Sequence, residues 1–380
     1  MTNRPRLLHV FSTFGAGGAQ LLMAGVMNEL GPAWSHSVMA MDGNFEAAYK
    51  LDPARVELVK PPPLNGSLGN ILALRRLLDT RRPSLLLTYN WGAIEAVAGG
   101  IVSRACPVIH QEHGFGAEEA DGLKQRRVMA RRILLNRILG TVVPSKTLQE
   151  IALEQYRVTP GKVLLIRNGV DVERFQPRPR DTETRRRLGV ADNTVLFGYV
   201  GRLGREKNLG LLIRAFARSG ARNAALALVG DGECVGELRE VAREAGIAER
   251  VIFTGAVQDP APHYAALDVF AMSSLTEQTP MALLEAMACG LPAVATDVGD
   301  TSDLLGGTGF PAVASKGDLK GYAGALRELG GRPELRAALG EANRRRCVEQ
   351  FSLRRMVEQY AAVWEGAVRP QGPLFVRGTN

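Results

Sequence analysis

The sequence predicts an α/β protein made of two doubly wound, Rossmann-like domains. Short apolar runs rich in β-forming residues alternate with longer helical patterns along nearly the whole chain, which is typical of βαβ units and parallel sheets. The alternation stops once, after Asn168, and then starts again. A length of 380 residues with 46% apolar residues is enough for a core in each of two domains. We expect the two domains to face each other across a cleft.

The first domain is predicted to span residues 1–168 and the second residues 169–352. An Asn-Gly pair and the spaced prolines within 168–179 cannot continue a helix or a central strand, which places the boundary there. The strands expected in the first domain are Leu7–Phe11, Ser37–Met41, Leu85–Tyr89, Val108–Gln111, Thr141–Val143 and Val163–Arg167. Those expected in the second domain are Val195–Val200, Ala225–Val229, Val251–Phe253, Val269–Met272 and Ala293–Ala295.

Helical stretches follow the second set of strands. They are Leu319–Leu329, Pro333–Gln350 and Leu353–Val368. The last of them carries an apolar stripe, which predicts a packing helix that joins the first domain. The members of this stripe are Met356, Tyr360, Val363 and Trp364. We expect residues 369–380 to form a loose tail.

Composition and charge narrow the functional classes. The four cysteines lie far apart without a C-x-x-C pair, which argues against a zinc site or a disulfide framework and fits a cytoplasmic protein. No uncharged apolar run is long enough to span a bilayer, and the N-terminal apolar stretch has no cleavage-like site. The net charge of +8 suits nucleic acid, phosphorylated substrates or an anionic membrane, and charge alone does not choose among them.

The loops that follow strands are the candidate sites, because doubly wound sheets bind ligands at the carboxyl ends of their strands. After the first strand, the backbone N–H groups of Gly17 and Gly18 at a helix start could bind a phosphate. A plain tight turn explains the same residues. The glycine spacing is not that of a dinucleotide-binding fingerprint, and no acidic residue is placed to hold an NAD ribose.

Two basic residues follow the first strand of the second domain. Arg202 and Lys207 lie on the loop between that strand and the next helix, where two cations can hold a diphosphate. Solvated surface charges are the alternative interpretation. No Asp-x-Asp motif or histidine cluster calls for a metal, so we expect neither a metal ion nor a cofactor.

The segment 273–292 carries the strongest signal. Thr279 is a good N-cap and Pro280 suits the first helical position. Gly290 and the proline two residues later end the helix after about nine residues. Free amides at the helix start could bind phosphate oxygens. These amides belong to Met281, Ala282 and Leu283.

Two glutamates accompany this helix. Glu277 precedes it and Glu285 lies on it, so one carboxylate can contact a sugar and the other a ribose. Capping and solvation are the alternative explanation. The neighbouring residues are apolar, however, and a carboxylate in such surroundings usually has a partner.

These motifs resemble those of family 4 retaining glycosyltransferases, which have the GT-B fold. In chain order they are Asn168-Gly169-Val170-Asp171, Arg202-x4-Lys207-Asn208, Gly230-Asp231-Gly232, Gly255-x-Val257 and Glu277-x7-Glu285-Ala-Met-Ala-Cys-Gly-Leu-Pro. The resemblance covers nearly the whole chain. It departs from the family's usual pattern at Gln278-Thr279, where Gly-Phe is common, and at Gln20, where Glu is common.

The resemblance implies a nucleoside diphosphate sugar as donor, held mainly by the second domain. Arg202 and Lys207 would hold the diphosphate, and Val257 would contact the base through its backbone. Glu285 would bind the ribose hydroxyls, and Glu277 would contact the transferred sugar.

In the first domain, His113 follows the strand Val108–Gln111 and precedes a glycine, at the position where a family member has a histidine facing the sugar. We favour it as the catalytic histidine. His110, earlier in the same stretch, is the rival. Asn90 and Trp91 follow the neighbouring strand and are expected on the acceptor side.

The segment 122–140 is basic, with no acidic residue. Its cations are Lys124, Arg126, Arg127, Arg131, Arg132 and Arg137. Beside apolar positions, such a helix suits an anionic membrane surface. Because the cations are spread around the helix, a solvated helix packed on the sheet is the alternative.

The sequence therefore predicts a metal-independent retaining glycosyltransferase. It would transfer a hexose-type sugar from a nucleoside diphosphate sugar to a saccharide or lipid-linked acceptor, by front-face attack, in cell-surface polysaccharide biosynthesis. We expect it in the cytoplasm, peripheral to the inner face of the membrane. A nucleotide-sugar epimerase on the same fold is one alternative. A basic nucleic-acid-binding protein is the other, and the lack of a recognisable nucleic-acid motif argues against it.

Overall fold

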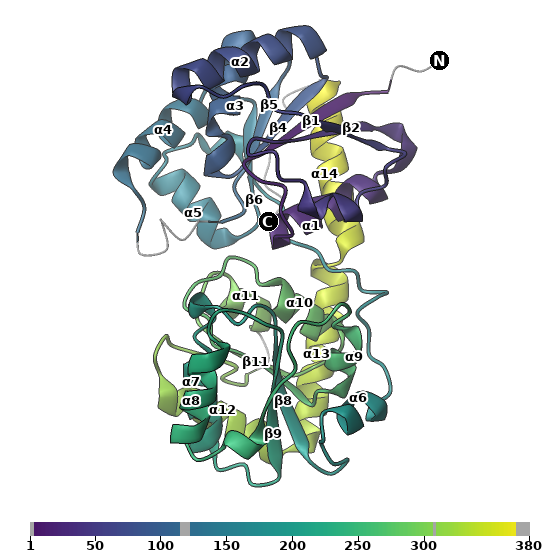
Figure 1. The fold of residues 1–380 in the computed structure, drawn as a ribbon, viewed down its shortest axis with the longest axis vertical. Helices are drawn as coiled ribbons and strands as arrows, with labels where there is room; N and C mark the ends of the chain where they lie inside the picture. Colours follow the sequence, from purple (N-terminus) through teal and green to yellow (C-terminus); the bar gives the residue numbers. More distant parts are fainter. Residues whose placement is uncertain (1–3, 115–121, 307–308, 370–380) are drawn as a thin grey trace. The chain divides into compact units, whose positions relative to one another are not determined.

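A computed structural model describes residues 4–114, 122–306 and 309–369 (Figure 1). The chain divides after Asn168 and after Leu353 into two compact units. Unit 1 combines the residues before the first division with those after the second, and unit 2 lies between the divisions. Each unit is built on one parallel sheet connected by helices, so the predicted pair of doubly wound domains is confirmed. The predicted tail lies outside the described residues, apart from Arg369.

Unit 1 contains a seven-stranded parallel sheet in the order β3-β2-β1-β4-β5-β6-β7, which changes winding direction between β1 and β4. The strands are β1 (Arg6–Phe11), β2 (Ser35–Ala40), β3 (Val56–Val59), β4 (Leu85–Tyr89), β5 (Val108–Gln111), β6 (Gly140–Val143) and β7 (Val163–Leu165). The sequence predicts all of them except β3. This strand lies at the sheet edge, and its two middle side chains are exposed, so it lacks the apolar run of a central strand.

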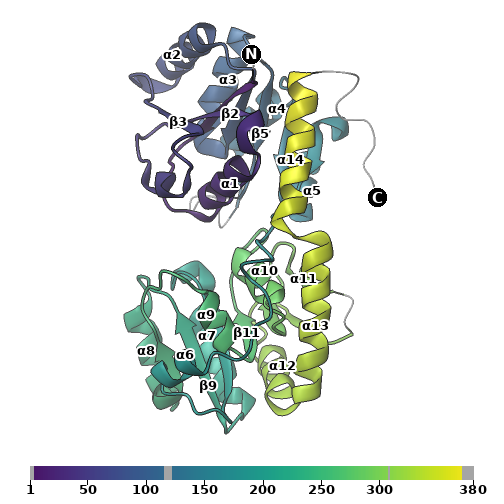
Figure 2. The same ribbon diagram turned by 90° about the vertical axis from the view of Figure 1, so that its right-hand side faces the viewer.

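The helices of unit 1 follow its strands along the chain. They are α1 (Gly18–Glu29), α2 (Gly66–Arg81), α3 (Ile94–Ser103), α4 (Gln125–Leu135) and α5 (Lys146–Glu154). A further helix, α14 (Leu353–Val368), is the last of the described chain and belongs almost entirely to unit 1. Figure 2 shows α14 in yellow alongside this unit.

A buried aromatic and histidine cluster joins α14 to the sheet of unit 1. Trp364 is fully buried and lies edge-on to His9 and His36, with ring centroids 5.5 and 6.1 Å apart. His9 is hydrogen-bonded through Nδ1 to Oη of Tyr89 (2.7 Å) and through Nε2 to Nδ1 of His36 (3.0 Å). Burial lowers the pKa of both histidines, that of His36 to about 4, so both rings are neutral at neutral pH.

Unit 2 contains a six-stranded parallel sheet in the order β10-β9-β8-β11-β12-β13. The strands are β8 (Val195–Val200), β9 (Ala224–Val229), β10 (Val251–Phe253), β11 (Val269–Met272), β12 (Ala293–Thr296) and β13 (Val313–Ala314). The first five are predicted from the sequence. Strand β13 has two residues, too few to form a recognisable apolar run.

The helices of unit 2 also follow its strands. They are α6 (Thr182–Arg187), α7 (Leu209–Ser219), α8 (Val235–Glu244), α9 (Ala261–Ala266), α10 (Met281–Ala288), α11 (Thr301–Leu305), α12 (Leu319–Gly331) and α13 (Pro333–Gln350). Helix α7 turns its buried face to the sheet through residues such as Leu212, Ile213 and Phe216. The spacing of these residues is that of one helix face.

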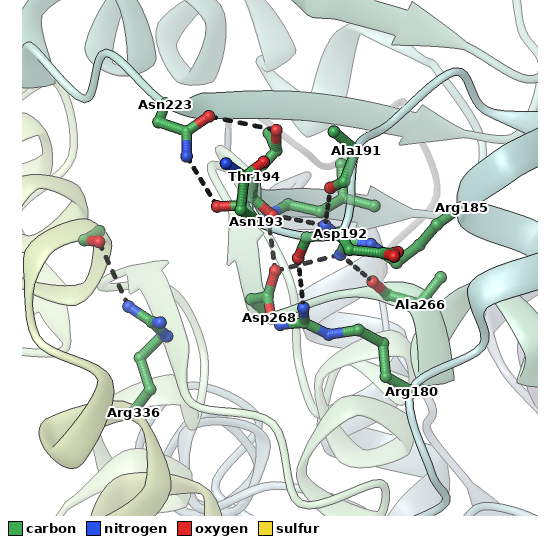
Figure 3. A network of polar contacts seen from close by, with 12 residues as sticks. Arg180, Arg185, Ala191, Asp192, Asn193, Thr194, Asn223, Ala266, Asp268 and Arg336 are labelled. Atoms are coloured by element: carbon green, nitrogen blue, oxygen red, sulfur yellow. Dashed lines mark hydrogen bonds and ion pairs between the residues drawn. The ribbon is translucent and has the colours of Figure 1, made fainter.

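A buried arginine ties α6 to the start of β8 and β11 (Figure 3). The guanidinium of Arg185 forms an ion pair with Asp268 (Nη1–Oδ2, 3.2 Å), with Arg185 fully buried and Asp268 8% exposed. The other oxygen of Asp268 is paired with Arg180. Oδ2 of Asp268 also accepts the N–H of Leu196 (2.8 Å). Arg185 donates to three backbone carbonyl groups as well, those of Ala191, Thr194 and Ala266.

Candidate active site

In unit 2, the loops after β8 and β11 meet where the strand order reverses. Lys207, on the loop after β8, extends its Nζ to Oε1 of Glu277 on the loop after β11, at 2.7 Å. The side chains are 20% and 16% exposed. Oε1 of Glu277 also accepts the hydroxyl of Ser274 (2.9 Å). Two of the predicted site residues, far apart in the sequence, are therefore in direct contact.

The loop that carries Glu277 is supported by the loop after β12. Gly299 has φ +52°, and a Cβ there would lie 2.4 Å from the carbonyl oxygens of Glu277 and Gln278. The N–H of Asp300 donates to the carbonyl oxygen of Gln278 (3.0 Å). Only glycine fits this close approach, so position 299 helps to fix the backbone that presents Glu277.

Arg202 lies on the same loop as Lys207 but is exposed. Its guanidinium pairs with Glu206 (2.6 Å) and Glu233 (3.1 Å), and its side chain is 59% exposed. Two carboxylates thus hold this cation at the mouth of the loop, whereas Lys207 is held inside it. Both predictions, a diphosphate contact and a solvated charge, fit this position of Arg202.

Helix α10 begins one residue later than the sequence suggests. Pro280 has extended backbone angles (φ −69°, ψ 116°) and its carbonyl oxygen accepts the N–H of Leu284 (3.2 Å), so Pro280 is the N-cap. The predicted N-cap at Thr279 is therefore wrong, and the helix has eight residues. The amides of its first turn, which have no acceptor within the helix, belong to Met281, Ala282 and Leu283.

The end of α10 is as predicted. Gly290 has φ +74°, and its N–H donates to the carbonyl oxygen of Met287 (3.0 Å). The N–H of Leu291 donates to the carbonyl oxygen of Ala286 (3.0 Å), which completes a Schellman-type end. Arg344 on α13 donates to the carbonyl oxygen of Ala288 (2.9 Å), so this end of α10 is also fixed from outside.

Glu285 on α10 is half-buried beside Tyr264, an aromatic residue that the sequence does not mark as part of the site. The hydroxyl of Tyr264 lies 2.8 Å from Oε2 of Glu285 and 3.2 Å from the carbonyl oxygen of Ala282. Burial raises the pKa of Glu285 to about 7, although the Tyr264 hydroxyl and the charge of Arg174 oppose the shift. On α9, Tyr264 resembles any core aromatic, which is why its role is not visible in the sequence.

Val257 lies on the loop after β10. Gly230 and Gly255 form an isolated antiparallel bridge, which connects the loops after β9 and β10. Val257 is half-buried and packs on the core of unit 2. Its loop is at the same edge of the sheet as Lys207 and Glu277, because the carboxyl ends of parallel strands lie at one edge.

In unit 1, the glycine-rich loop forms a compact turn at the start of α1. Gly17 is the N-cap and Gly18 the first helical residue. Nε2 of Gln20 donates to the carbonyl oxygen of Thr13 (3.1 Å), and a Cβ at Gly17 would lie 2.6 Å from Oε1 of Gln20. This geometry is compatible with both interpretations, the phosphate site and the plain turn.

His113 and Asn90 are in contact at the carboxyl ends of β5 and β4. Oδ1 of Asn90 accepts the backbone N–H of His113 (2.7 Å), and Asn90 has φ +57°. The ring of His113 stacks on Tyr89 and lies 3.4 Å, Nε2 to Oε1, from Gln111. Burial lowers the pKa of His113 to about 4, so the imidazole is neutral at neutral pH.

His110 belongs to a different, fully buried network. Its Nδ1 lies 2.9 Å from Oγ1 of Thr88, and its Nε2 lies 3.4 Å from Oε2 of Glu112. Glu112 forms an ion pair with Arg131 (3.0 Å), and both side chains are buried. This environment gives His110 a structural role in the sheet.

Arg131 has other surroundings than the sequence suggests. The guanidinium of Arg131 lies over the ring of Trp91, 5.0 Å from its centroid, and Arg127 lies over the same ring at 5.1 Å. Since Arg131 is buried and ion-paired, its assignment to a membrane-facing surface is wrong. An arginine in a basic stretch gives no sign of burial when its partner, Glu112, lies on another element.

Two further observations concern only the described part of the chain. Within residues 4–114, 122–306 and 309–369, no group of three or more histidine, cysteine or acidic side chains is arranged to hold a metal ion. Among the helices described there, none combines the length and the apolar character needed to cross a membrane.

Two family models match the chain. The model described as Glycosyltransferase Family 4 matches residues 16–174, and the model described as Glycosyl transferases group 1 matches residues 194–331. The two matches fall on either side of the division after Asn168, one for the most part in each unit.

Curated relatives agree with these matches. A D-inositol 3-phosphate glycosyltransferase from Geodermatophilus obscurus is 35% identical over 229 residues, which are 57% of this chain and 50% of the relative. A lipopolysaccharide core biosynthesis mannosyltransferase, LpsB from Rhizobium meliloti, is 31% identical over 226 residues, 56% of this chain and 63% of the relative. The chain thus spans about half to two thirds of the length of these relatives.

Among solved structures, HepE from Anabaena in complex with UDP is similar to this chain. The TM-score is 0.82 with 22% sequence identity, and the match covers 94% of this chain and 98% of HepE. At this identity the similarity shows the fold alone, that of two parallel-sheet, Rossmann-like units.

Proposed function

The chain belongs to the family 4 glycosyltransferases and has the GT-B fold, and we propose that it transfers a hexose-type sugar from a nucleoside diphosphate sugar to an acceptor, with retention. The observation that carries this proposal is the Lys207–Glu277 pair at the strand reversal of unit 2. A cation, a carboxylate and the free amides of α10 at one sheet edge supply what an anionic, hydroxyl-rich donor requires.

In the proposed donor complex, Lys207 exchanges partners. A phosphate oxygen of the donor replaces the Glu277 carboxylate at Nζ, with Arg202 as a second cation on the same loop. Glu277 is then free to accept hydrogen bonds from the hydroxyls of the transferred sugar. Glu285 receives the ribose hydroxyls, and the backbone at Val257 contacts the base.

The same groups serve the proposed chemical step. The bond between the anomeric carbon and the diphosphate oxygen breaks, and the acceptor hydroxyl forms its new bond on the same face. The acceptor proton passes to the leaving phosphate oxygen. Lys207, Arg202 and the dipole of α10 stabilise the charge on the departing diphosphate, which is the task of a metal ion in other transferases.

Front-face attack is favoured by the state of Glu112, the carboxylate next to His113 in the sequence. Glu112 is buried and bound to Arg131, so it is not available as a nucleophile. His113 is proposed to contact the sugar as a neutral hydrogen-bonding group, because burial holds its pKa near about 4.

We propose a saccharide or lipid-linked acceptor in cell-surface polysaccharide biosynthesis, reached in the cytoplasm at the inner face of the membrane. Helix α4 supports this location. Met129 and Ile133 are 54% and 46% exposed on it, and three residues before Met129 lies the exposed Arg126. The exposed Arg137 follows the helix. Apolar side chains between cations suit an anionic lipid surface.

A thermal-shift screen tests the donor assignment. We expect UDP, GDP or their sugars to raise the melting temperature, and ATP to have little effect, because only a ligand of the folded state stabilises it. No shift with any sugar nucleotide would remove the proposal. Incubation with donor alone then tests the epimerase, for which the relatives compared give no support: a new sugar epimer without acceptor would favour it.

A further inference from the structure

Glu285 is a half-buried residue whose carboxyl group has no ion pair in the described part of the chain. Its side-chain partner is the hydroxyl of Tyr264, at 2.8 Å from Oε2. Tyr264 is fully buried between Phe175, at 5.8 Å between ring centroids, and Phe270, at 6.2 Å. The hydroxyl is therefore fixed in place, and its orientation is limited to the polar groups around it.

The Tyr264 hydroxyl can serve both protonation states of Glu285. The Tyr264 hydroxyl has one hydrogen, but it faces two oxygens, Oε2 of Glu285 at 2.8 Å and the carbonyl oxygen of Ala282 at 3.2 Å. If Glu285 is ionised, Tyr264 donates to it, and the carbonyl oxygen of Ala282 still accepts a backbone N–H within α10. If Glu285 carries a proton, it donates to Tyr264, which donates to Ala282, and both contacts are satisfied.

The charged groups around Glu285 do not compensate its burial. Arg174 favours the ionised form, but it forms its own ion pair with Asp259 (2.9 Å), whose charge opposes ionisation. From α13, Arg344 is occupied by backbone carbonyl groups. The thiol of Cys289, near Glu285 on α10, has its own pKa raised by burial and by the Glu285 charge. Arg178 lies near Cys289, and the Cys347 thiol contacts the carbonyl oxygen of Leu284, so neither places a charge directly on the Glu285 carboxyl.

We propose that Tyr264 is a positioning residue that lets Glu285 hold a proton before the donor binds and release it when the donor binds. This inference rests on the proposed function, in which ribose hydroxyls reach Glu285. Those hydroxyls donate to the carboxyl oxygens, so the Glu285 proton leaves to solvent and Tyr264 turns its O–H towards the carboxylate. Donor binding is then coupled to the loss of one proton.

A ligand-free measurement tests the protonated state by itself. A carboxyl group whose pKa is higher in the folded protein than in the unfolded chain stabilises the fold at low pH and loses that effect as the pH rises to its folded pKa. We expect the melting temperature of Glu285→Gln, minus that of the wild type, to grow from about pH 4.5 to about pH 7 and then stay level. A constant difference would overturn the proposal.

Calorimetric titration tests the coupling to the donor. UDP-glucose and GDP-mannose are suitable probes because each of their phosphates is linked on both sides, by an ester and an anhydride bond, and has no second proton to lose. A terminal phosphate, in contrast, titrates at about pH 6. We expect wild-type affinity to fall about thirtyfold from about pH 8.5 to about pH 5.5, with about one proton released at the acid end. Glu285→Gln should bind more weakly, without this pH dependence and without proton release.

Tyr264→Phe separates positioning from a merely structural role. Without the hydroxyl, the ionised carboxylate loses its donor, so the midpoint of the pH dependence should move to higher pH. Tyr322→Phe is the matched control, since Tyr322 is also buried in unit 2 and its hydroxyl donates to a backbone carbonyl, that of Val294 at 3.3 Å. This control should leave the midpoint unchanged.

The outcomes separate this inference from the proposed function. Binding of a sugar nucleotide with level affinity and no proton release overturns the inference and leaves the proposed function standing. Failure of both sugar nucleotides to bind at any pH overturns the function and the coupling together. An unchanged midpoint in Tyr264→Phe contradicts the role given to Tyr264.

Discussion

The ion pair between Lys207 and Glu277 holds both side chains in place before any donor binds. Each group compensates the charge of the other in a largely buried position, which reduces the cost of keeping either of them there. The donor phosphate can replace Glu277 as the partner of Lys207 because both groups are negatively charged. Preformed contacts of this sort limit the ordering that binding requires.

At Lys207 and Glu285 we expect replacement by alanine to weaken donor binding without unfolding the protein. A charged hydrogen bond contributes about 1.5–3 kcal/mol, so each variant should lose about tenfold or more in affinity for the sugar nucleotide that binds best. Calorimetry and thermal melting measure the two effects together. Lys320→Ala, an exposed lysine of the same unit, is the control. Unchanged affinity in both site variants would remove the donor-site assignment.

The buried histidines of unit 1 predict sensitivity to acid. Burial lowers the pKa of His36 and His113 to about 4, and it also lowers the pKa of His9. The unfolded chain therefore binds protons that the folded one does not. The contribution of these neutral histidines to the unfolding free energy is therefore complete above about pH 6.5 and is lost as the pH falls towards about 4.

Tryptophan fluorescence measures this loss, because the three tryptophans, Trp34, Trp91 and Trp364, all lie in unit 1. We expect the melting temperature seen by fluorescence to fall between about pH 6.5 and about pH 4. His36→Gln should make the fall shallower. A wild-type melting temperature that stays constant over this range contradicts the assignment of neutral buried histidines.

Single residues differ in how much of their environment the sequence reveals. Glu277 and Lys207 stand on loops after predicted strands, and topology alone brings such loops to one edge of a sheet. Arg131 and Tyr264 could not be placed in this way, because their partners come from other elements. Their chemistry depends on packing in three dimensions, which spacing along the chain does not encode.

Among the elements, α6 is attached through Arg185, whose buried ion pair with Asp268 adds to its hydrogen bonds with backbone carbonyl groups. Asp268→Ala would leave Arg185 charged and without its carboxylate in a buried position, which should cost about 3–5 kcal/mol of unfolding free energy. Chemical denaturation followed by circular dichroism measures the change. Glu183→Ala is the control on the same helix, because its exposed pair with Arg186 should contribute less than about 1 kcal/mol. Equal losses of unfolding free energy in both variants would contradict a larger contribution from the buried pair than from the exposed one.

Helix α4 is expected to bind anionic vesicles through its exposed side. Each cation near an anionic surface contributes about 1 kcal/mol, and salt screens the attraction. Changing Arg126, Arg132 and Arg137 to glutamine should therefore abolish co-sedimentation with anionic vesicles at low salt. Neutral vesicles should bind neither protein.

A control with the same change in charge shows whether α4 itself is the contact. Arg186, Arg187 and Arg354 are exposed elsewhere, and their replacement by glutamine should leave sedimentation unchanged. If both triple variants sediment like the wild type, α4 is not the docking surface. If both lose binding, net charge alone governs the attraction.

The ends of helices and strands are predictable where the conformational preference of a single residue determines them. Gly290 ends α10 because a left-handed backbone conformation suits glycine, and the sequence shows this directly. The start of α10 is harder to predict. Thr279 suits the N-cap and Pro280 suits the first helical position, but the N–H of Leu284 donates to the carbonyl oxygen of Pro280, which makes Pro280 the N-cap. Strands β3 and β13 are set by neighbouring strands and not by their own residues.

For the molecule as a whole, the proposed use of cations and a helix dipole predicts transfer without a divalent metal. Sugar transfer should continue in excess EDTA at a rate close to that of the untreated protein. The measurement is product formation from the sugar nucleotide selected by thermal shift and a saccharide or lipid-linked acceptor. Complete loss of transfer, restored only by Mg²⁺ or Mn²⁺, contradicts the prediction, and a metal-dependent transferase assayed in parallel shows that the EDTA is effective.

The position of α14 has a consequence for biosynthesis. Unit 2 is inserted in the chain between the two parts of unit 1, so the ribosome completes unit 2 before it makes the helix that carries Trp364. Until α14 is synthesised, His9 and His36 lack the tryptophan ring that packs against them in the folded unit. A stop codon after residue 352 would thus leave unit 2 nearly complete and would leave unit 1 without α14.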